Sequence, residues 1–134
     1  MAEDLGARAF AAARVLVGVR FVPQGRDRSI GLDCVGLVWA AYAAAGRVLV
    51  APAGYPLRGW RRERIEAALA SAGFSRVDDR RDGDVALVAL AAGQFHLGVM
   101  GPATFVHAHA GLRRVVETPL ANPLPDFETW RLKF

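Results

Sequence analysis

The sequence contains a single cysteine and three histidines, and their positions favour a thiol nucleophile served by an imidazole base. Cys34 follows Asp33 at the predicted start of a helix, where unpaired amide hydrogens and the helix dipole favour a negative charge. This position is expected to lower the pKa of the thiol, and the thiolate is the reactive form. Gly36 leaves room for another backbone or a substrate to approach closely.

A cysteine nucleophile needs a base, and His96 is the candidate. In a strand over residues 95–100, His96, Gly98 and Met100 share one face. Gly98 is expected to remove a side chain where the helix that carries Cys34 has to lie close.

The base needs a polar neighbour that orients its ring, and His107 is the candidate. A turn over residues 100–103 would pair Val99 with Thr104 and place His96 directly opposite His107, with both rings on one face. A loop one residue shorter would place the rings on opposite faces. We predict the first register.

A zinc site is an alternative use of the same residue types, and it would combine Cys34, His96, His107 and His109. No Cys-x-x-Cys spacing supports it. We therefore predict no metal and no other cofactor, and we expect His109 to be peripheral.

The carboxylates near these residues have simpler roles. Asp33 is placed to cap the helix that begins at Cys34, because its side chain can accept the free amide hydrogens of the first turn. Asp82 and Asp84 are interpreted as turn residues on either side of Gly83. No pair of carboxylates has a spacing that requires acid–base chemistry.

The elements that position these residues are predicted to be helices in the N-terminal part of the chain and strands in the C-terminal part. Helical spacing predicts helices over residues 7–17, 34–45 and 60–72, with a loop over 18–32 and mostly irregular chain over 47–57. Short strands are expected over 85–90, 95–100, 104–109, 113–118 and 128–132. We predict an α+β fold in a single domain over residues 1–134, with N-terminal helices on one face of a roughly five-stranded antiparallel sheet.

The composition limits the class of protein. The 53% hydrophobic share describes a folded globular chain, and one cysteine excludes an internal disulfide. The net charge of +4 favours anionic partners, but no nucleic-acid-binding motif is present, and we predict no nucleic-acid partner. The acidic start at Glu3 and Asp4 predicts no secretory signal, and no apolar run reaches the ~20 residues of a membrane span.

Four sequence blocks, taken in order, resemble the NlpC family of papain-like cell-wall cysteine peptidases. They are Gly31-Leu32-Asp33-Cys34-Val35-Gly36-Leu37-Val38, Gly83-Asp84-Val85, His96-Leu97-Gly98-Val99 and Phe105-Val106-His107-Ala108. The resemblance runs from about residue 7 to residue 118. It implies a papain-like NlpC-type fold, with Cys34 as nucleophile, His96 as base and His107 as the third polar residue.

A narrower resemblance rests on residues 24–27, 31–34 and 113–117, which look like the stand-alone peptidases of tailed phages and gene transfer agents. The family resemblance implies cleavage of peptidoglycan stems at the D-γ-glutamyl–diaminopimelate bond, and the narrower resemblance implies tail-tip proteins as partners. It also implies that the chain is made in the cytoplasm without a signal peptide. A phage or gene-transfer-agent particle would then carry it to the target cell's periplasm.

The sequence departs from the family pattern in two places. Val35 replaces the serine that follows the nucleophile, which the attack does not require. Phe21 stands where the family has a tyrosine whose hydroxyl helps to bind the oxyanion. The Cys34 amide remains, and we expect Gln24, Arg26 and Asp33 to contribute to oxyanion or substrate binding. The alternatives are a weakly active or inactive structural tail component, or another acyl-transfer or amide-hydrolysis reaction on the same fold.

Overall fold

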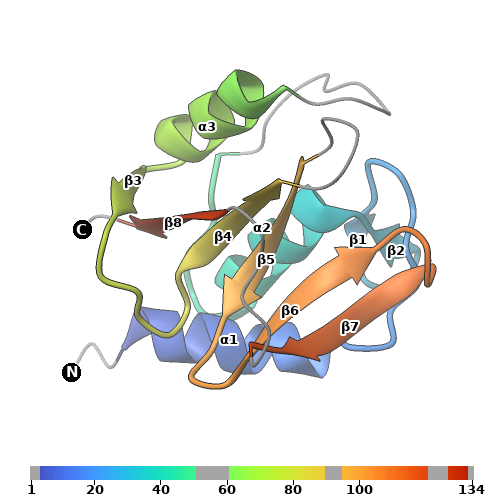
Figure 1. The fold of residues 1–134 in the computed structure, drawn as a ribbon. Helices are drawn as coiled ribbons and strands as arrows, with labels where there is room; N and C mark the ends of the chain where they lie inside the picture. The colour runs from blue at the N-terminus through green and yellow to red at the C-terminus, as the bar shows by residue number, and fades with distance from the viewer. Residues whose placement is uncertain (1–3, 51–60, 90–94, 121–126, 133–134) are drawn as a thin grey trace.

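The computed structural model describes residues 4–50, 61–89, 95–120 and 127–132. These residues form three helices and two sheets (Figure 1). The helices are α1 (Leu5–Val15), α2 (Cys34–Ala44) and α3 (Arg62–Ser71). The strands are β1 (Arg26–Asp27), β2 (Gly31–Leu32), β3 (Phe74–Val77), β4 (Val85–Ala89), β5 (Phe95–Met100), β6 (Thr104–His109), β7 (Arg114–Pro119) and β8 (Phe127–Leu132).

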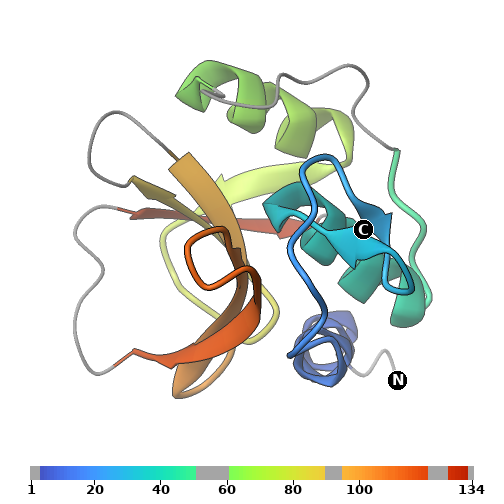
Figure 2. The ribbon, with the colours of Figure 1, turned by 90° about the vertical axis from the view of Figure 1, so that its right-hand side faces the viewer.

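The main sheet is antiparallel and six-stranded, in the order β3-β8-β4-β5-β6-β7. The view along the sheet in Figure 2 shows α1 and α2 on one of its faces. Buried residues of all three helices share one core cluster with Leu87, Leu97 and Val99 of the sheet. The predicted α+β arrangement, with helices on one face, is confirmed.

Helix α2 forms as its sequence predicts. Asp33 caps its start, since the Asp33 Oδ1 atom accepts a hydrogen bond from the Gly36 amide at 2.8 Å. The helix is buried on nearly every side, in agreement with its apolar sequence. Beyond its end, Gly46 adopts a φ of 105°, which favours glycine. Local sequence therefore fixes where Cys34 stands.

The other predicted elements differ from those of the structure mostly in where they begin and end. Helix α1 begins at Leu5 because the Asp4 side chain accepts from the Ala7 amide at 3.3 Å. Helix α3 begins at Arg62, and Trp60, the predicted first residue, lies outside the described residues. The predicted loop over 18–32 contains the short hairpin of β1 and β2. The sheet gains a sixth strand, β3, a short edge strand that pairs with β8.

The predicted register of β5 and β6 is wrong by two residues. Met100 lies opposite Phe105, and Gly98 rather than His96 lies opposite His107. The cause is the neighbouring strand, because the Met100 amide donates to the Asp84 carbonyl at 2.8 Å and keeps Met100 within the sheet. A shift of two residues preserves the side-chain alternation, so His96 and His107 still share a face.

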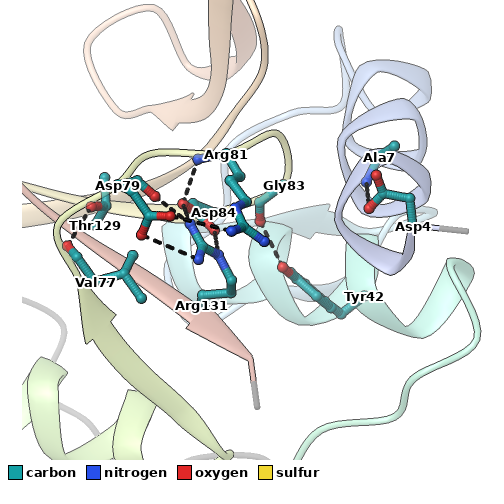
Figure 3. Close-up of polar contacts among 10 residues, drawn as sticks. All are labelled: Asp4, Ala7, Tyr42, Val77, Asp79, Arg81, Gly83, Asp84, Thr129 and Arg131. Carbon is teal, nitrogen blue, oxygen red and sulfur yellow. Dashed lines mark hydrogen bonds and ion pairs between the residues drawn. The ribbon is translucent and has the colours of Figure 1, made fainter. Parts of the chain in front are cut away.

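Asp84 closes the predicted turn, since its amide donates to the Arg81 carbonyl at 3.1 Å, and it is also a buried carboxylate at the start of β4 (Figure 3). Its two oxygens accept from the Nε and Nη2 atoms of Arg131 at 2.8 and 2.9 Å. The Arg81 amide donates to the same carboxylate at 2.8 Å. The adjacent Gly83 carbonyl accepts from the Tyr42 hydroxyl at 2.6 Å. These contacts join β8 and α2 to the strand that sets the register of β5.

Within the described ranges, no helix combines the length and the apolar character that a membrane crossing requires.

Candidate active site

Cys34 is the first residue of α2, and its sulfur lies against strand β5. The Leu97 amide hydrogen bonds to the sulfur. The Met100 amide points toward β4. Backbone amides alternate in direction along a strand, so the Leu97 amide, three residues earlier, points toward β6. The described pairing of β5 with β6 starts at Gly98, so the Leu97 amide lies just beyond that ladder. The sulfur therefore occupies the position where the two strands separate.

The thiol is in a more apolar place than the sequence predicts. Burial, and to a smaller extent the neighbouring Asp33 carboxylate, raises the pKa of Cys34 to about 12. Hydrogen bonds from the backbone amides of Leu97, Val35 and Cys34 itself oppose this rise in pKa. The prediction of a lowered pKa is therefore wrong, because desolvation outweighs the favourable field of the helix start. At neutral pH the resting sulfur is a thiol.

The structure brings His96 and His107 together. Their ring centroids lie 5.0 Å apart, with the planes tilted by 45°. Burial, with a smaller effect of the nearby His109 ring, lowers the pKa of His96 to about 4. The pKa of His107 is lowered to about 4 by burial and then by the His96 and His109 rings. Both rings are therefore neutral at pH 7, the form that can accept a proton.

The sulfur and the imidazoles reach β5 from opposite faces. Leu97 and Val99 face the helices and belong to the core cluster around α2. His96 alternates to the other face, where Met100 and Phe105 belong to a separate apolar cluster. The peptide unit between His96 and Leu97 connects the two faces, because its amide donates a hydrogen bond to the Cys34 sulfur.

His107 is the most enclosed of the imidazoles, at 5% exposure. It stacks on the Phe105 ring with centroids 4.4 Å apart and planes 11° apart. Its Nε2 atom lies 2.8 Å from the Thr118 hydroxyl oxygen. Its Nδ1 atom is buried without a hydrogen-bond partner among the described residues. Sequence reasoning missed Thr118, because only the register of β6 and β7 shows that it lies beside His107.

Gly98 has a different role from the predicted one. A Cβ atom there would lie 2.7 Å from the Phe105 ring, on the face away from α2. The residue therefore makes room for the aromatic ring that stacks on His107. The prediction that it makes room for the helix is wrong. Gly36 does fulfil the prediction of close backbone approach, since a Cβ atom there would lie 1.9 Å from the Gly25 carbonyl oxygen.

Asp33 links the start of α2 to the preceding loop. Its Oδ2 atom accepts from the Gln24 amide at 2.8 Å, while Oδ1 caps the helix. Gln24 adopts a φ of 59° there, which is uncommon for a residue with a side chain. This places Asp33 as a positioning residue. The binding roles of the Gln24 and Arg26 side chains stay predictions.

Phe21 lies against the core, and His109 lies beside His107. Phe21 packs against the core cluster and forms a bridge to Leu32. His109 lies with its ring centroid 5.7 Å from that of His107, and its Nδ1 atom accepts from the Leu112 amide at 3.0 Å. Among the described residues, no group of three or more His, Cys, Asp and Glu side chains is arranged to hold a metal ion.

Comparison with solved structures identifies the fold. The NlpC/p60 domain of the peptidoglycan hydrolase SagA matches with a TM-score of 0.63 and 25% identity, over 92% of this chain and 97% of that domain. NlpC2 from Trichomonas vaginalis matches with a TM-score of 0.70 and 18% identity, over 98% of this chain and 48% of that one. The peptidoglycan hydrolase RipB from Mycobacterium tuberculosis matches with a TM-score of 0.62 and 18% identity, over 97% of this chain and 66% of that one.

The chain thus has the fold of NlpC/p60 domains, as the sequence predicts. It spans nearly the whole SagA domain but about half of the Trichomonas protein. No protein-family model matches the sequence, and no curated protein matches it.

Proposed function

We propose that this protein is a cysteine peptidase that hydrolyses the peptide stems of peptidoglycan. Cys34 is the nucleophile, His96 the base and His107 the group that orients the base. The observation that carries the proposal is the hydrogen bond from the Leu97 amide to the Cys34 sulfur, one residue along β5 from His96, whose ring lies 5.0 Å from that of His107. The peptidoglycan hydrolase domains with the same fold support the substrate class.

The proposed reaction starts from a neutral thiol and a neutral imidazole. Because the pKa of Cys34 is raised and that of His96 is lowered, proton transfer in the empty site is uphill. We therefore propose that His96 takes the proton as the sulfur attacks the stem-peptide carbonyl. The sulfur–carbon bond forms, and His96 then gives the proton to the leaving amine as the carbon–nitrogen bond breaks. Water hydrolyses the thioester and regenerates the thiol.

The candidate backbone donor for the oxyanion of this reaction is the Cys34 amide. Phe21 carries no hydroxyl, and losing one such donor costs on the order of 10²–10³ in turnover. The Gln24 and Arg26 side chains are the candidates for a second donor. This feature favours a second candidate function, a weakly active or inactive structural component that keeps the fold.

The finer parts of the proposal rest on the sequence blocks. We propose the D-γ-glutamyl–diaminopimelate bond as the bond cut. We also propose that a phage or gene-transfer-agent tail tip carries the protein from the cytoplasm to the target cell's periplasm, with tail-tip proteins as its partners. The four family blocks support the bond, and residues 24–27 and 113–117, together with the block around Cys34, support the tail-tip role.

The proposed activity is tested by mass spectrometry of purified muropeptides after incubation with the wild-type protein and with Cys34→Ala. The expected result is two products whose masses identify the bond cut, and no products with the variant. Digestion by both proteins would refute the role of Cys34. The absence of products with either protein, both correctly folded, would favour the structural component.

A further inference from the structure

We propose that Thr118 is a positioning residue that fixes the tautomer of His107, so that the Nδ1 atom of His107 is left as an acceptor for the ring of His96. The inference rests on the proposed function, since it concerns how His107 orients the base. It starts from the Thr118 hydroxyl, 2.8 Å from Nε2 of a ring whose Nδ1 atom has no partner among the described residues.

Two arrangements are compatible with this contact. A neutral imidazole carries one hydrogen, and a hydroxyl can both donate and accept. If the hydrogen is on Nε2, His107 donates to Thr118, and Nδ1 keeps a free lone pair. If Thr118 donates to Nε2, the hydrogen is on Nδ1, and His107 has nothing with which to accept an N–H of His96. Only the first arrangement serves an orienting group, because such a group accepts from the base.

The surroundings of His107 hold its ring in place for this purpose. Phe105 stacks on it at 4.4 Å, so the ring plane is fixed. Phe105 lies opposite Thr118 in the β6–β7 ladder, which places the hydroxyl on the same face as the two rings. The His96 ring is the nearest imidazole, at 5.0 Å between centroids. A flip of the His107 ring would place the Cε1 carbon where Nε2 lies and remove the hydrogen bond to Thr118.

The tautomer can be read without any measurement of activity. In protein labelled with ¹⁵N-histidine, long-range ¹H–¹⁵N correlation spectra distinguish a ring protonated at Nε2 from one protonated at Nδ1. The expected result for the wild type at pH 7 is His107 protonated at Nε2. Thr118→Val is expected to give a mixture of tautomers, and Thr118→Ser to restore the wild-type spectrum. Protonation at Nδ1 in the wild type, or an unchanged spectrum in Thr118→Val, would overturn the inference.

Kinetics on muropeptides then connect the tautomer to the reaction. Thr118→Val is expected to lower kcat about tenfold, the effect of one hydrogen bond, with KM nearly unchanged. Thr104→Val is the matched control, because it removes a threonine hydroxyl that donates to Glu117 at 2.6 Å, away from His107. An equal loss of kcat in both variants would indicate a general effect on the sheet and overturn the role of Thr118. If the wild type cleaves no muropeptide, the proposed function fails, while the spectra still report the tautomer.

Discussion

The imidazole rings of His96 and His107 lie 5.0 Å apart, diagonally across the β5–β6 ladder rather than directly opposite each other. Gly98 occupies the position opposite His107, and the Phe105 ring fills the space above it. The diagonal contact keeps both rings on one face while the strands separate beyond Gly98. That separation is where the Cys34 sulfur meets the Leu97 amide.

The raised pKa of Cys34 predicts slow alkylation at neutral pH. With a pKa of about 12, the thiol should react with iodoacetamide at pH 7 on the order of 10²-fold more slowly than a free cysteine, after allowance for the greater nucleophilicity of a more basic thiolate. The rate should keep rising above pH 9, where a free cysteine levels off. Labelling followed by intact-mass spectrometry gives the profile, with glutathione as the reference. Rapid labelling at pH 7 would show that the site holds a thiolate.

The two buried imidazoles predict a loss of stability in mild acid. Their pKa values are lowered in the folded state, so the unfolded chain binds protons first as the pH falls below 6.5. The free energy of unfolding should therefore fall between pH 6.5 and pH 4, by on the order of 3 kcal/mol for each ring. Urea unfolding across this range measures the effect. His107→Gln should give a shallower slope; an identical slope would mean that His107 is not buried as a neutral ring.

The buried ion pair between Asp84 and Arg131 predicts unequal effects of two similar substitutions. Asp84→Asn should reduce the free energy of unfolding by about 3 kcal/mol, because it leaves a partly buried guanidinium without its carboxylate. Asp79→Asn removes a mostly exposed partner of the same arginine, 3.4 Å away, and should cost less than about 1 kcal/mol. Chemical unfolding compares the two variants. Equal effects would contradict the assigned role of Asp84.

Phe21 offers a test of the missing oxyanion donor. If the phenylalanine limits catalysis, Phe21→Tyr should raise kcat on muropeptides by roughly tenfold or more, because it supplies a hydroxyl donor. Phe21→Leu is the control for changes in packing against the core cluster. A tyrosine variant with unchanged kcat would mean that another donor already serves the oxyanion.

The parts of this fold that sequence predicts well are the local ones. Asp33 caps α2 with a side chain three residues from the amide it accepts, so local pattern locates Cys34. Strands β5 and β6 have the predicted bounds, since the turn between them contains Gly101 and Pro102. The register between these strands depends on the hydrogen bond from the Met100 amide to the Asp84 carbonyl. The side chain of Asp84 is held in turn by Arg131, which is distant in sequence. No local pattern carries that information.

The chemistry of the site also has one part that the local sequence predicts and another that depends on tertiary contacts. The residue types and their order along the chain are enough to select Cys34, His96 and His107 as candidates. The raised pKa of Cys34 results from the packing of α2 against β5, which the helix-start argument does not include. The contact between Thr118 and His107 depends on the β6–β7 register. Desolvation and cross-strand contacts are tertiary effects, and they decide the protonation states of the site.

The most direct test of the central claim is to trap the acyl-enzyme. Muropeptide reactions of the wild type, His96→Ala and Cys34→Ala are quenched in acid and analysed by intact-mass and peptide-level mass spectrometry. A stem-peptide acyl group is expected on Cys34 in the wild type, with little or none in His96→Ala and none in Cys34→Ala. An acyl group on another residue, or stem cleavage by the Cys34→Ala protein, would contradict it.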